Sequence, residues 1–465
     1  MSGSGVAKRI HFVGIGGIGM SGIAEILLGQ GWRVTGSDLQ RGPTVRRLEA
    51  LGAQVSIGHD ARHLGDAEWV VISSAIRPEN PEWVEAQRRG LRVMARGEML
   101  AELMRGKRGI AVAGSHGKTT VTALLTRCLV EVGLDPTALI GGRVTALGTN
   151  ARLGKGNFLV AEADESDGSF LHLAPEMAVI TNIEPEHLDH YGDLENIRSA
   201  FVQFAHRTPP DGRVILCTDD PNAAGLLHRI ERPVVPYGTR TPTGWRAEKV
   251  VVDGVVSTFV AVSPRGDRLE VRLNLPGSHN VLNALAVLAV LHELGAPLET
   301  AARTLARFEG VERRFQRKGE ARGVLVFDDY GHHPTEIRAT LAAARKACPG
   351  RRLVVVFQPH RYTRTQALMS AFAGAFDDAD LLVVTDIYPA GEDPIPGVGS
   401  SNLVARLQAR GKETVHVPRV EEVLGHLSDV LNDGDLLLTL GAGDVWKVGE
   451  AFLAAEQAQV EGSQA

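Results

Sequence analysis

The chain has 465 residues, of which 44% are hydrophobic and 23% charged, and its formal net charge is −5. This balance excludes a strongly basic nucleic-acid-binding protein. No apolar run approaches the ~18 residues of a transmembrane helix, no signal-peptide pattern opens the chain, and the three cysteines include no CxxC pair. We therefore expect a cytoplasmic protein without nucleic-acid or membrane partners, whose oligomeric state, monomer or dimer, the sequence leaves open.

Short runs rich in Val, Ile and Leu alternate with stretches of helical spacing, which indicates α/β domains with parallel sheets covered on both faces. These runs lie at residues 9–14, 69–73, 109–113, 158–161, 177–181, 213–217, 353–357, 381–385 and 435–440. Residues 247–275 instead alternate apolar and polar side chains around turn sequences, which predicts a small antiparallel addition. Breaks near residue 106 and at 310–317 predict three domains, at 1–106, 107–311 and 312–465.

A first glycine-rich loop follows the apolar run that opens the first domain. Residues 14–19 read Gly-Ile-Gly-Gly-Ile-Gly, which fits G-x-G-x-x-G, and Asp38 ends the next expected strand. Such glycines let the backbone approach a diphosphate, and the acid is typical of a ribose partner. The pattern is common in NAD(P) dehydrogenases, but another diphosphate nucleotide or a turn needed only for packing also satisfies it.

A second glycine-rich loop, Gly-Ser-His-Gly-Lys-Thr-Thr at residues 114–120, follows the run at 109–113. Val112 stands where the full Walker pattern has glycine. The working parts remain, because backbone N–H groups can cradle phosphates, Lys118 can reach the β- and γ-phosphates, and the Thr119 hydroxyl can ligate Mg²⁺. A merely capped helix start is the alternative. Two phosphate loops in one chain argue against a simple dehydrogenase.

Carboxylates and histidines follow the next two expected strands. Residues 162–167 read Glu-Ala-Asp-Glu-Ser-Asp, and residues 182–191 contain further acids together with His187. Because α/β sheets bind ligands at the carboxyl ends of their strands, these groups could converge on Mg²⁺ beside phosphates. Histidine is an unusual Mg²⁺ ligand, so surface loops with solvated side chains remain the alternative.

Two strings in the third segment each follow an expected strand: Asp-Asp-Tyr-Gly-His-His-Pro-Thr-Glu at 328–336 and Phe-Gln-Pro-His-Arg-Tyr-Thr-Arg-Thr at 357–365. Arg361 and Arg364 are three residues apart, which predicts that they share one helical face and bind a carboxylate as a fork. Tyr330, His332 and His360 could add hydrogen bonds or a base.

Together these strings resemble the Mur ligase family, over residues 10 to about 447. The resemblance includes residues 14–25, Ser-Ser-Ala-Ile at 73–76 and Gly-Ser-His-Asn at 277–280. It implies an ATP-dependent ligase with a Rossmann-like N-terminal domain, a central P-loop-type ATPase domain and a Rossmann-like C-terminal domain. The first loop, residues 73–76 and the two C-terminal strings resemble the member that joins L-alanine to the lactyl carboxylate of UDP-N-acetylmuramate. That reaction passes through an acyl phosphate in peptidoglycan precursor synthesis.

The resemblance also implies a role for each matching residue. The UDP diphosphate would lie at Gly16, Gly17, Ile18, Gly19, Met20 and Ser21, and the uridine near Asp38, His59 and Ser74. ATP would be bound by Gly114, Ser115, His116, Gly117, Lys118, Thr119 and Thr120, with His279, Asn280 and Asn283 at the adenine and Arg313 or Arg314 at the ribose or phosphates. Thr119 and Glu162 would hold one Mg²⁺ and His187 a second. L-Alanine would be bound by Tyr330, His332, His360, Arg361 and Arg364, and His332 is our candidate for the general base.

Three other functions remain open at this point. The chain could be an NAD(P)-dependent oxidoreductase with an accessory nucleotide domain, or a Mur ligase that adds another amino acid or peptide. It could also be a nucleotide-sensing protein without catalysis, although binding alone would not require acidic and histidine strings in all three segments.

Overall fold

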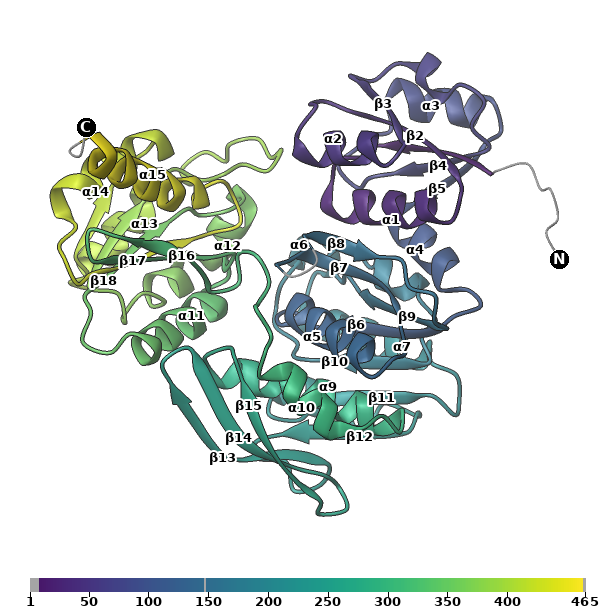
Figure 1. The fold of residues 1–465 in the computed structure, drawn as a ribbon. Helices are drawn as coiled ribbons and strands as arrows, with labels where there is room; N and C mark the ends of the chain where they lie inside the picture. Colours follow the sequence, from purple (N-terminus) through teal and green to yellow (C-terminus); the bar gives the residue numbers. More distant parts are fainter. Residues whose placement is uncertain (1–7, 146–147, 463–465) are drawn as a thin grey trace. The chain divides into compact units, whose positions relative to one another are not determined.

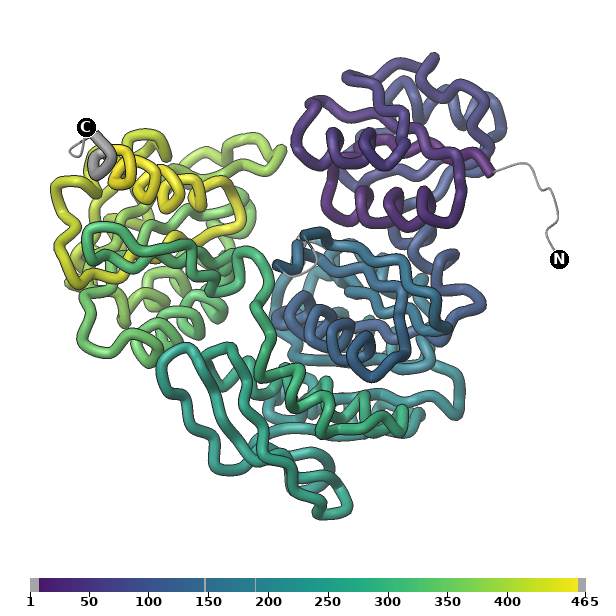
Figure 2. Tube along the Cα trace, in the orientation of Figure 1, coloured from purple at the N-terminus to yellow at the C-terminus, as the bar shows by residue number. Residues whose placement is uncertain are grey.

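The computed structural model describes residues 8–145 and 148–462 and contains three sheets (Figures 1 and 2). The polar start of the sequence, residues 1–7, lies outside the described residues. The chain forms two compact units: unit 1 comprises Met1–Val250, Phe259–Leu273 and Asn280–Glu309, and unit 2 comprises Val251–Thr258, Asn274–His279 and Gly310–Ala465. Among the described residues, no helix is both long and apolar enough to cross a bilayer.

The first sheet of unit 1 is parallel throughout and has the strand order β3-β2-β1-β4-β5. Its strands are β1 (Arg9–Val13), β2 (Arg33–Asp38), β3 (Gln54–Ile57), β4 (Trp69–Ile72) and β5 (Arg92–Ala95). The helices between them are α1 (Ile18–Gly29), α2 (Pro43–Ala50), η1 (Ala61–Leu64), α3 (Pro81–Arg88) and α4 (Arg96–Met104). The chain order reverses at β1, which places the first glycine loop at the switch point of a Rossmann-like sheet, as predicted.

The second sheet has ten strands in the order β15-β14-β13-β12-β11-β10-β6-β9-β7-β8. They are β6 (Arg108–Ala113), β7 (Thr137–Val144), β8 (Thr149–Arg152), β9 (Phe158–Glu162), β10 (Met177–Ile180), β11 (Arg213–Cys217), β12 (Val234–Gly238), β13 (Trp245–Asp253), β14 (Val256–Val262) and β15 (Arg268–Leu273). The parallel strands β9, β6 and β10 are neighbours. Consecutive strands β13 to β15 form one edge, where the sequence predicts the small addition.

Helices connect the strands of this second sheet. They are α5 (Lys118–Glu131), η2 (Ser169–His172), α6 (Leu188–Tyr191), α7 (Leu194–His206), α8 (Pro221–Ala224), α9 (Ser278–Glu293) and α10 (Leu298–Leu305). Because β6 lies between β9 and β10, the phosphate loop after β6 is flanked by the loops that follow those two strands. The topology therefore brings the lysine, acidic and histidine strings of the central segment to one edge of the sheet.

The third sheet belongs to unit 2 and has the order β16-β17-β21-β18-β19-β20. Its strands are β16 (Gln316–Ala321), β17 (Val324–Asp329), β18 (Leu353–Phe357), β19 (Leu381–Val384), β20 (Thr414–His416) and β21 (Leu436–Leu440), and its helices are α11 (Pro334–Ala347), α12 (Tyr362–Ala373), α13 (Ser400–Ala409), α14 (Val420–Val430) and α15 (Trp446–Gly462). Only β16 is antiparallel to its neighbour. Alternate residues of β18 belong to two different apolar clusters, so helices cover both faces of this sheet.

An aromatic cluster anchors the loop that follows β9. Phe170 of η2 lies 5.3 Å from Phe201 and 5.0 Å from Phe204 of α7, measured between ring centroids. All three side chains are buried. The acidic string therefore runs between a central strand and a packed aromatic anchor, which fixes both of its ends.

Replacing Phe204 by alanine tests this anchor. We expect Phe204→Ala to lower the free energy of unfolding by about 3–5 kcal/mol, because the large ring leaves a cavity in a packed core. Urea unfolding followed by circular dichroism measures the loss. The exposed neighbour Gln203 supplies the control, since Gln203→Ala should change the free energy by no more than about 0.5 kcal/mol. Equal effects of the two substitutions would contradict the anchor.

Candidate active site

The phosphate loop turns sharply between β6 and α5. Gly114 has φ 138° and Gly117, the N-cap of α5, has φ 86°. A Cβ on Gly114 would lie 2.0 Å from the Thr181 Oγ1, and a Cβ on Gly117 would lie 2.6 Å from the Asn283 Oδ1. Both positions therefore require glycine, for the backbone angle and for the space.

The end of β10 holds the phosphate loop in place. The His116 N–H donates to the Asn182 Oδ1 (2.8 Å), and the Asn182 Nδ2 donates to the His116 carbonyl (3.0 Å). The same carbonyl accepts from the Thr181 Oγ1 (2.6 Å), and the Ser115 Oγ accepts from the Glu184 N–H (2.8 Å). Asn182 thus positions the loop, a role that its sequence context, an amide directly after a strand, indicates only in retrospect.

Lys118 lies inside the loop that it ends. Its Nζ donates to the carbonyls of Gly114 (2.6 Å) and Ser115 (3.2 Å) and to the Glu165 Oε1 (2.8 Å). Burial lowers the pKa of Lys118, but Glu165, Glu162 and a third nearby carboxylate raise it above its usual value. The ammonium is therefore charged at neutral pH and points at the place where a phosphate loop binds phosphate.

Thr119 and Glu162, which the resemblance assigns to one Mg²⁺, are in direct contact. The Thr119 Oγ1 donates to the Glu162 Oε2 at 2.9 Å, and the Gly141 N–H donates to the same oxygen at 2.8 Å. A hydroxyl and a carboxylate oxygen are suitable Mg²⁺ ligands. These residues fit a magnesium ion next to the phosphate loop.

A second group of ligand atoms surrounds Glu165. Its carboxylate and the side chains of Glu186 and His187 each offer one ligand atom, and these atoms all lie within 4.8 Å of one another. The Glu165 Oε2 is buried and has no hydrogen-bond partner in the described part of the chain. His187 has φ 54°, the left-handed conformation. The set fits a divalent cation, and it adds Glu165 and Glu186 to the predicted His187.

The residues predicted at the adenine occupy different surroundings. The Asn283 Nδ2 donates to the Asn280 Oδ1 at 3.1 Å, and both side chains are buried on α9. The Asn283 Oδ1 faces Gly117, so this side chain lies behind the phosphate loop. His279 is exposed and belongs to unit 2.

The first glycine loop is tied to the end of β2. The N–H groups of Gly14 and Ile15 donate to the Ser37 carbonyl at 2.9 and 3.0 Å. The Gly16 N–H donates to the Asp38 Oδ2 at 2.8 Å. Asp38, predicted to contact the uridine, therefore also closes the loop in this structure.

The remaining predicted diphosphate residues start α1. Gly17 is the N-cap, and Ile18 and Gly19 form the first turn, where N–H groups face an incoming anion. Ile18 is exposed, whereas the side chains of Met20 and Ser21 are buried. Met20 and Ser21 thus offer backbone groups rather than side chains to a ligand at this turn.

Two predicted uridine residues lie at the ends of neighbouring strands, and a buried carboxylate supports one of them. The His59 Nδ1 lies 3.1 Å from the Ser37 Oγ and 3.3 Å from the Glu82 Oε1, while Ser74 is exposed after β4. Burial raises the pKa of Glu82, but hydrogen bonds from His11 and Ser37 hold it at about 2. Glu82 belongs to no motif, so the sequence analysis missed it.

In unit 2, the two arginines of the predicted fork do not share a helical face, which corrects that expectation. The helix α12 begins at Tyr362, and Arg361 precedes it with φ 68°, a non-helical conformation. The Arg361 Nε is buried and has no hydrogen-bond partner among the described residues. The Arg364 Nη1 donates to the His360 Nδ1 at 3.2 Å. Arg361 is positioned by the strained backbone instead of by the helix.

His332 and His360 lie side by side, with ring centroids 5.7 Å apart. The His332 Nδ1 donates to the Tyr330 carbonyl at 3.1 Å, which leaves its Nε2 as a proton acceptor. Because His360 accepts from Arg364, its own proton lies on Nε2. Burial lowers the pKa of His332 well below its usual value, and burial and Arg364 lower the pKa of His360 to about 3.

Arg313 and Arg314 differ in their freedom to bind a ligand. The Arg313 Nε donates to the Asp328 Oδ2 (3.1 Å), its Nη1 donates to the Gly443 carbonyl (3.0 Å), and its Nη2 donates to the Gly441 carbonyl. The Arg314 guanidinium lies 5.2 Å from the centroid of the Tyr330 ring. Of the two predicted alternatives, Arg314 therefore has the side chain that a nucleotide could recruit.

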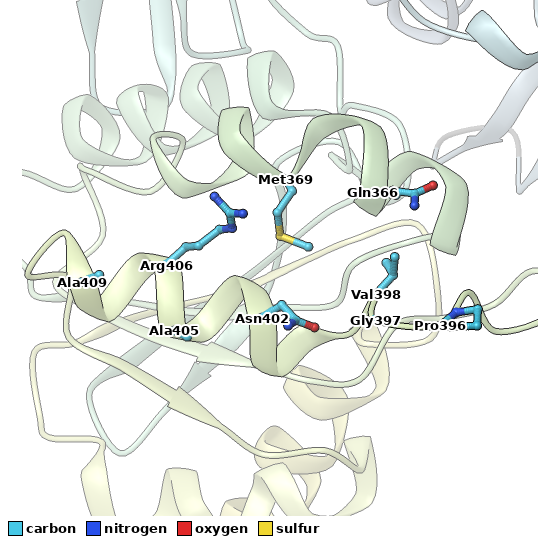
Figure 3. A pocket seen from close by; sticks show the side chains of 9 residues that line it. All are labelled: Gln366, Met369, Pro396, Gly397, Val398, Asn402, Ala405, Arg406 and Ala409. Carbon is cyan, nitrogen blue, oxygen red and sulfur yellow. The ribbon is translucent and has the colours of Figure 1, made fainter.

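A groove of about 570 Å³ separates α12 from α13 in unit 2 (Figure 3). Met369, Val398 and Arg406 are among its lining residues, with Gln366 and Asn402 at one end. None of the predicted site residues lines it. The groove is therefore separate from the histidine and arginine cluster at the start of α12.

The parallel sheets, the phosphate loop and its acidic neighbours define a nucleotide-binding α/β enzyme. Family models match three consecutive parts of the chain: "Mur ligase family, catalytic domain" at residues 9–108, "Mur ligase middle domain" at 112–291 and "Mur ligase, glutamate ligase domain" at 313–443. The chain belongs to the Mur ligase family.

Named relatives are similar over nearly the full length. A UDP-N-acetylmuramate–L-alanine ligase of Geobacter sp. (strain M21) is 54% identical over 97% of this chain and 98% of the relative. One of Myxococcus xanthus is 52% identical over 96% and 95%. The crystal structure of UDP-N-acetylmuramate–alanine ligase from Thermotoga maritima matches with 31% identity and a TM-score of 0.84, over 97% of this chain and 99% of that one.

The buried histidines predict a pH-dependent stability. The pKa of His360 is about 3 in the folded chain against an ordinary 6.5, so between these values the unfolded chain binds a proton that the folded chain does not. The free energy of unfolding should therefore fall as the pH drops from 6.5 towards 3. Urea unfolding across this range measures the slope, which His360→Gln should reduce. An unchanged slope in that variant would contradict a depressed pKa.

Proposed function

We propose that this chain is an ATP-dependent ligase that joins L-alanine to the lactyl carboxylate of UDP-N-acetylmuramate in peptidoglycan precursor synthesis. The observation that carries the proposal is the 54% identity, over 97% of the chain, to a ligase of that name. A charged lysine inside a phosphate loop, next to two sets of metal ligands, supplies the chemistry that such a reaction needs. Because ATP and nucleotide sugars are cytoplasmic metabolites, we place the reaction in the cytoplasm.

The carboxylate must first be activated, because oxide is too poor a leaving group for direct attack by an amine. A lactyl oxygen attacks the γ-phosphorus of ATP, a new P–O bond forms, and the bond to ADP breaks. The product is an acyl phosphate. The alanine nitrogen then attacks the acyl carbon, the tetrahedral intermediate expels phosphate, and the nitrogen loses a proton. The sum is one amide, one ADP and one phosphate for each ATP.

Lys118 and the loop N–H groups stabilise the charge on the transferring phosphoryl group. Its three present acceptors show that the ammonium already has the orientation it needs, so a phosphate oxygen replaces one of them on binding. Thr119 and Glu162 would hold one Mg²⁺, and Glu165, Glu186 and His187 a second cation. A bound Mg²⁺ screens the repulsion between the carboxylate and the phosphates.

The other predicted roles belong to the same proposal. The loop at residues 16–21 binds the diphosphate of the sugar nucleotide, and Asp38, His59 and Ser74 bind the uridine. His279, Asn280 and Asn283 serve the adenine end of ATP, with Arg314 at its ribose or phosphates. The buried position of Asn283 supports an indirect role for it, through the phosphate loop.

Unit 2 binds L-alanine in this proposal. Arg361 and Arg364 bind the amino-acid carboxylate, helped by Tyr330 and His360. His332 is unprotonated at neutral pH and its Nε2 accepts a proton, so it can take the proton that the alanine ammonium must lose before attack.

An ADP-release assay with UDP-N-acetylmuramate, ATP and a panel of amino acids tests the function. We expect release that depends on all three substrates and is fastest with L-alanine. Without an amino acid, hydroxylamine should trap the acyl phosphate. Lys118→Ala should nearly abolish turnover while sugar-nucleotide binding stays measurable. Amide formation without ATP, or near-normal turnover of Lys118→Ala, would refute the proposal, and preference for another amino acid would correct the substrate.

The arginine pair has its own test. We expect Arg361→Ala or Arg364→Ala to raise the KM for L-alanine by at least about tenfold, because each removes a charge-assisted hydrogen bond. The KM for ATP should change little. The exposed Arg410, at the end of α13, supplies the control. Equal increases for both substrates would exclude a specific role in binding the carboxylate.

A further inference from the structure

Arg96, the first residue of α4, lies between the first glycine loop and the acidic loop that follows β9. A Cβ on Gly19 would be 2.8 Å from the Arg96 Cδ, 3.2 Å from its Nη1 and 3.3 Å from its Nε. On its other side, the Arg96 Nη2 donates to the Asp164 Oδ2 at 2.9 Å. One guanidinium group thus connects the first turn of α1 with the loop beside Lys118, and all of these residues belong to unit 1.

Packing fixes this position. A Cβ on Gly97 would lie 2.6 Å from the Ser169 Cβ, so the start of α4 is pressed against η2. The Asn150 Nδ2 of β8 donates to the Ile18 carbonyl at 2.7 Å, which fastens the start of α1 to the second sheet. The Arg96 side chain is 21% exposed. It is therefore a largely enclosed group with access to solvent, unlike a flexible surface arginine.

The guanidinium has donors to spare on the side of the glycine loop. Its described hydrogen bond uses Nη2, whereas Nε and Nη1 have no hydrogen-bond partner among the described residues and lie against Gly19. A guanidinium fork matches the oxygens of a phosphate, and the α1 N-terminus adds positive charge at the same place. Gly19 leaves the space that this approach requires, because any side chain there would meet Arg96.

We propose that Arg96 binds the diphosphate of the sugar nucleotide and that Asp164, from the acidic loop, positions it. The inference rests on the proposed function, because it takes the first glycine loop as the site of UDP. It has a consequence that the motifs do not indicate. A substitution in the acidic loop on the ATP side should weaken binding of the other substrate.

Calorimetric titration with UDP, and with uridine as a probe that lacks the diphosphate, tests the role of Arg96 without ATP or turnover. We expect Arg96→Ala to weaken UDP binding by about 10- to 100-fold, as the loss of hydrogen bonds to a charged group predicts, and to leave uridine binding unchanged. Arg96→Lys should restore part of the affinity. Arg108 pairs with Glu176 on β6, and Arg108→Ala is the matched control that should bind UDP normally.

The role of Asp164 is tested by a double-mutant cycle with the same probe. Asp164→Asn should weaken UDP binding, and the double variant should bind no more weakly than Arg96→Ala alone, because Asp164 acts through Arg96. A purely structural ion pair would lower the thermal unfolding midpoint without this selective loss. Should Arg96→Ala fail to fold, Arg96→Gln removes the charge with a smaller loss of packing.

Three results would overturn the inference: unchanged UDP affinity in a folded Arg96 variant, an equal loss for uridine and UDP, or additive effects of the two substitutions. The proposed function fails separately. If the wild type binds UDP through Arg96 but forms no amide, the inference about Arg96 stands and the assigned reaction does not.

Discussion

The buried ammonium of Lys118 is the interaction on which the central part of unit 1 depends. It satisfies two loop carbonyls and one carboxylate, while two further carboxylates of the same loop lie close enough to raise its pKa. Removing one partner of a buried ion pair typically costs about 3–5 kcal/mol, because the other charge is left uncompensated. The phosphate loop and the acidic loop are therefore folded around one positive charge, and the proposed chemistry uses that same charge.

The other two sheets fix their loops by comparable means. In the first sheet, the buried Glu82 accepts hydrogen bonds from Ser37 and from the Asp60 backbone, which joins the ends of β2 and β3. In the third sheet, the Arg313 guanidinium ties β17 to the loop after β21. Each carboxyl edge thus has a buried charge that is used for support. The residues proposed to meet substrates lie on the loops that this support holds.

Backbone strain marks two of the proposed binding residues. His187 has φ 54° and Arg361 has φ 68°, although neither is glycine. Such conformations cost about 1–3 kcal/mol and persist only where the surrounding structure enforces them. Here the adjacent short helix α6 and the helix α12 begin directly after the strained residue. The strain aims each side chain away from the course that a regular helix would give it, which is consistent with a role in binding.

The sequence by itself determined the alternation of strands and helices, the two glycine loops, and the edge of the second sheet at which acids and His187 gather. Apolar periodicity, glycine spacing and the parallel rule are local signals, so they can be recognised without coordinates. Only the tertiary structure decided that β21 lies between β17 and β18, that Arg361 precedes its helix, and that Glu165 and Glu186 join His187. It alone paired Arg96 with Asp164, 68 residues away. The partner of a charged side chain depends on which distant segments pack against it, and no spacing along the chain encodes that choice.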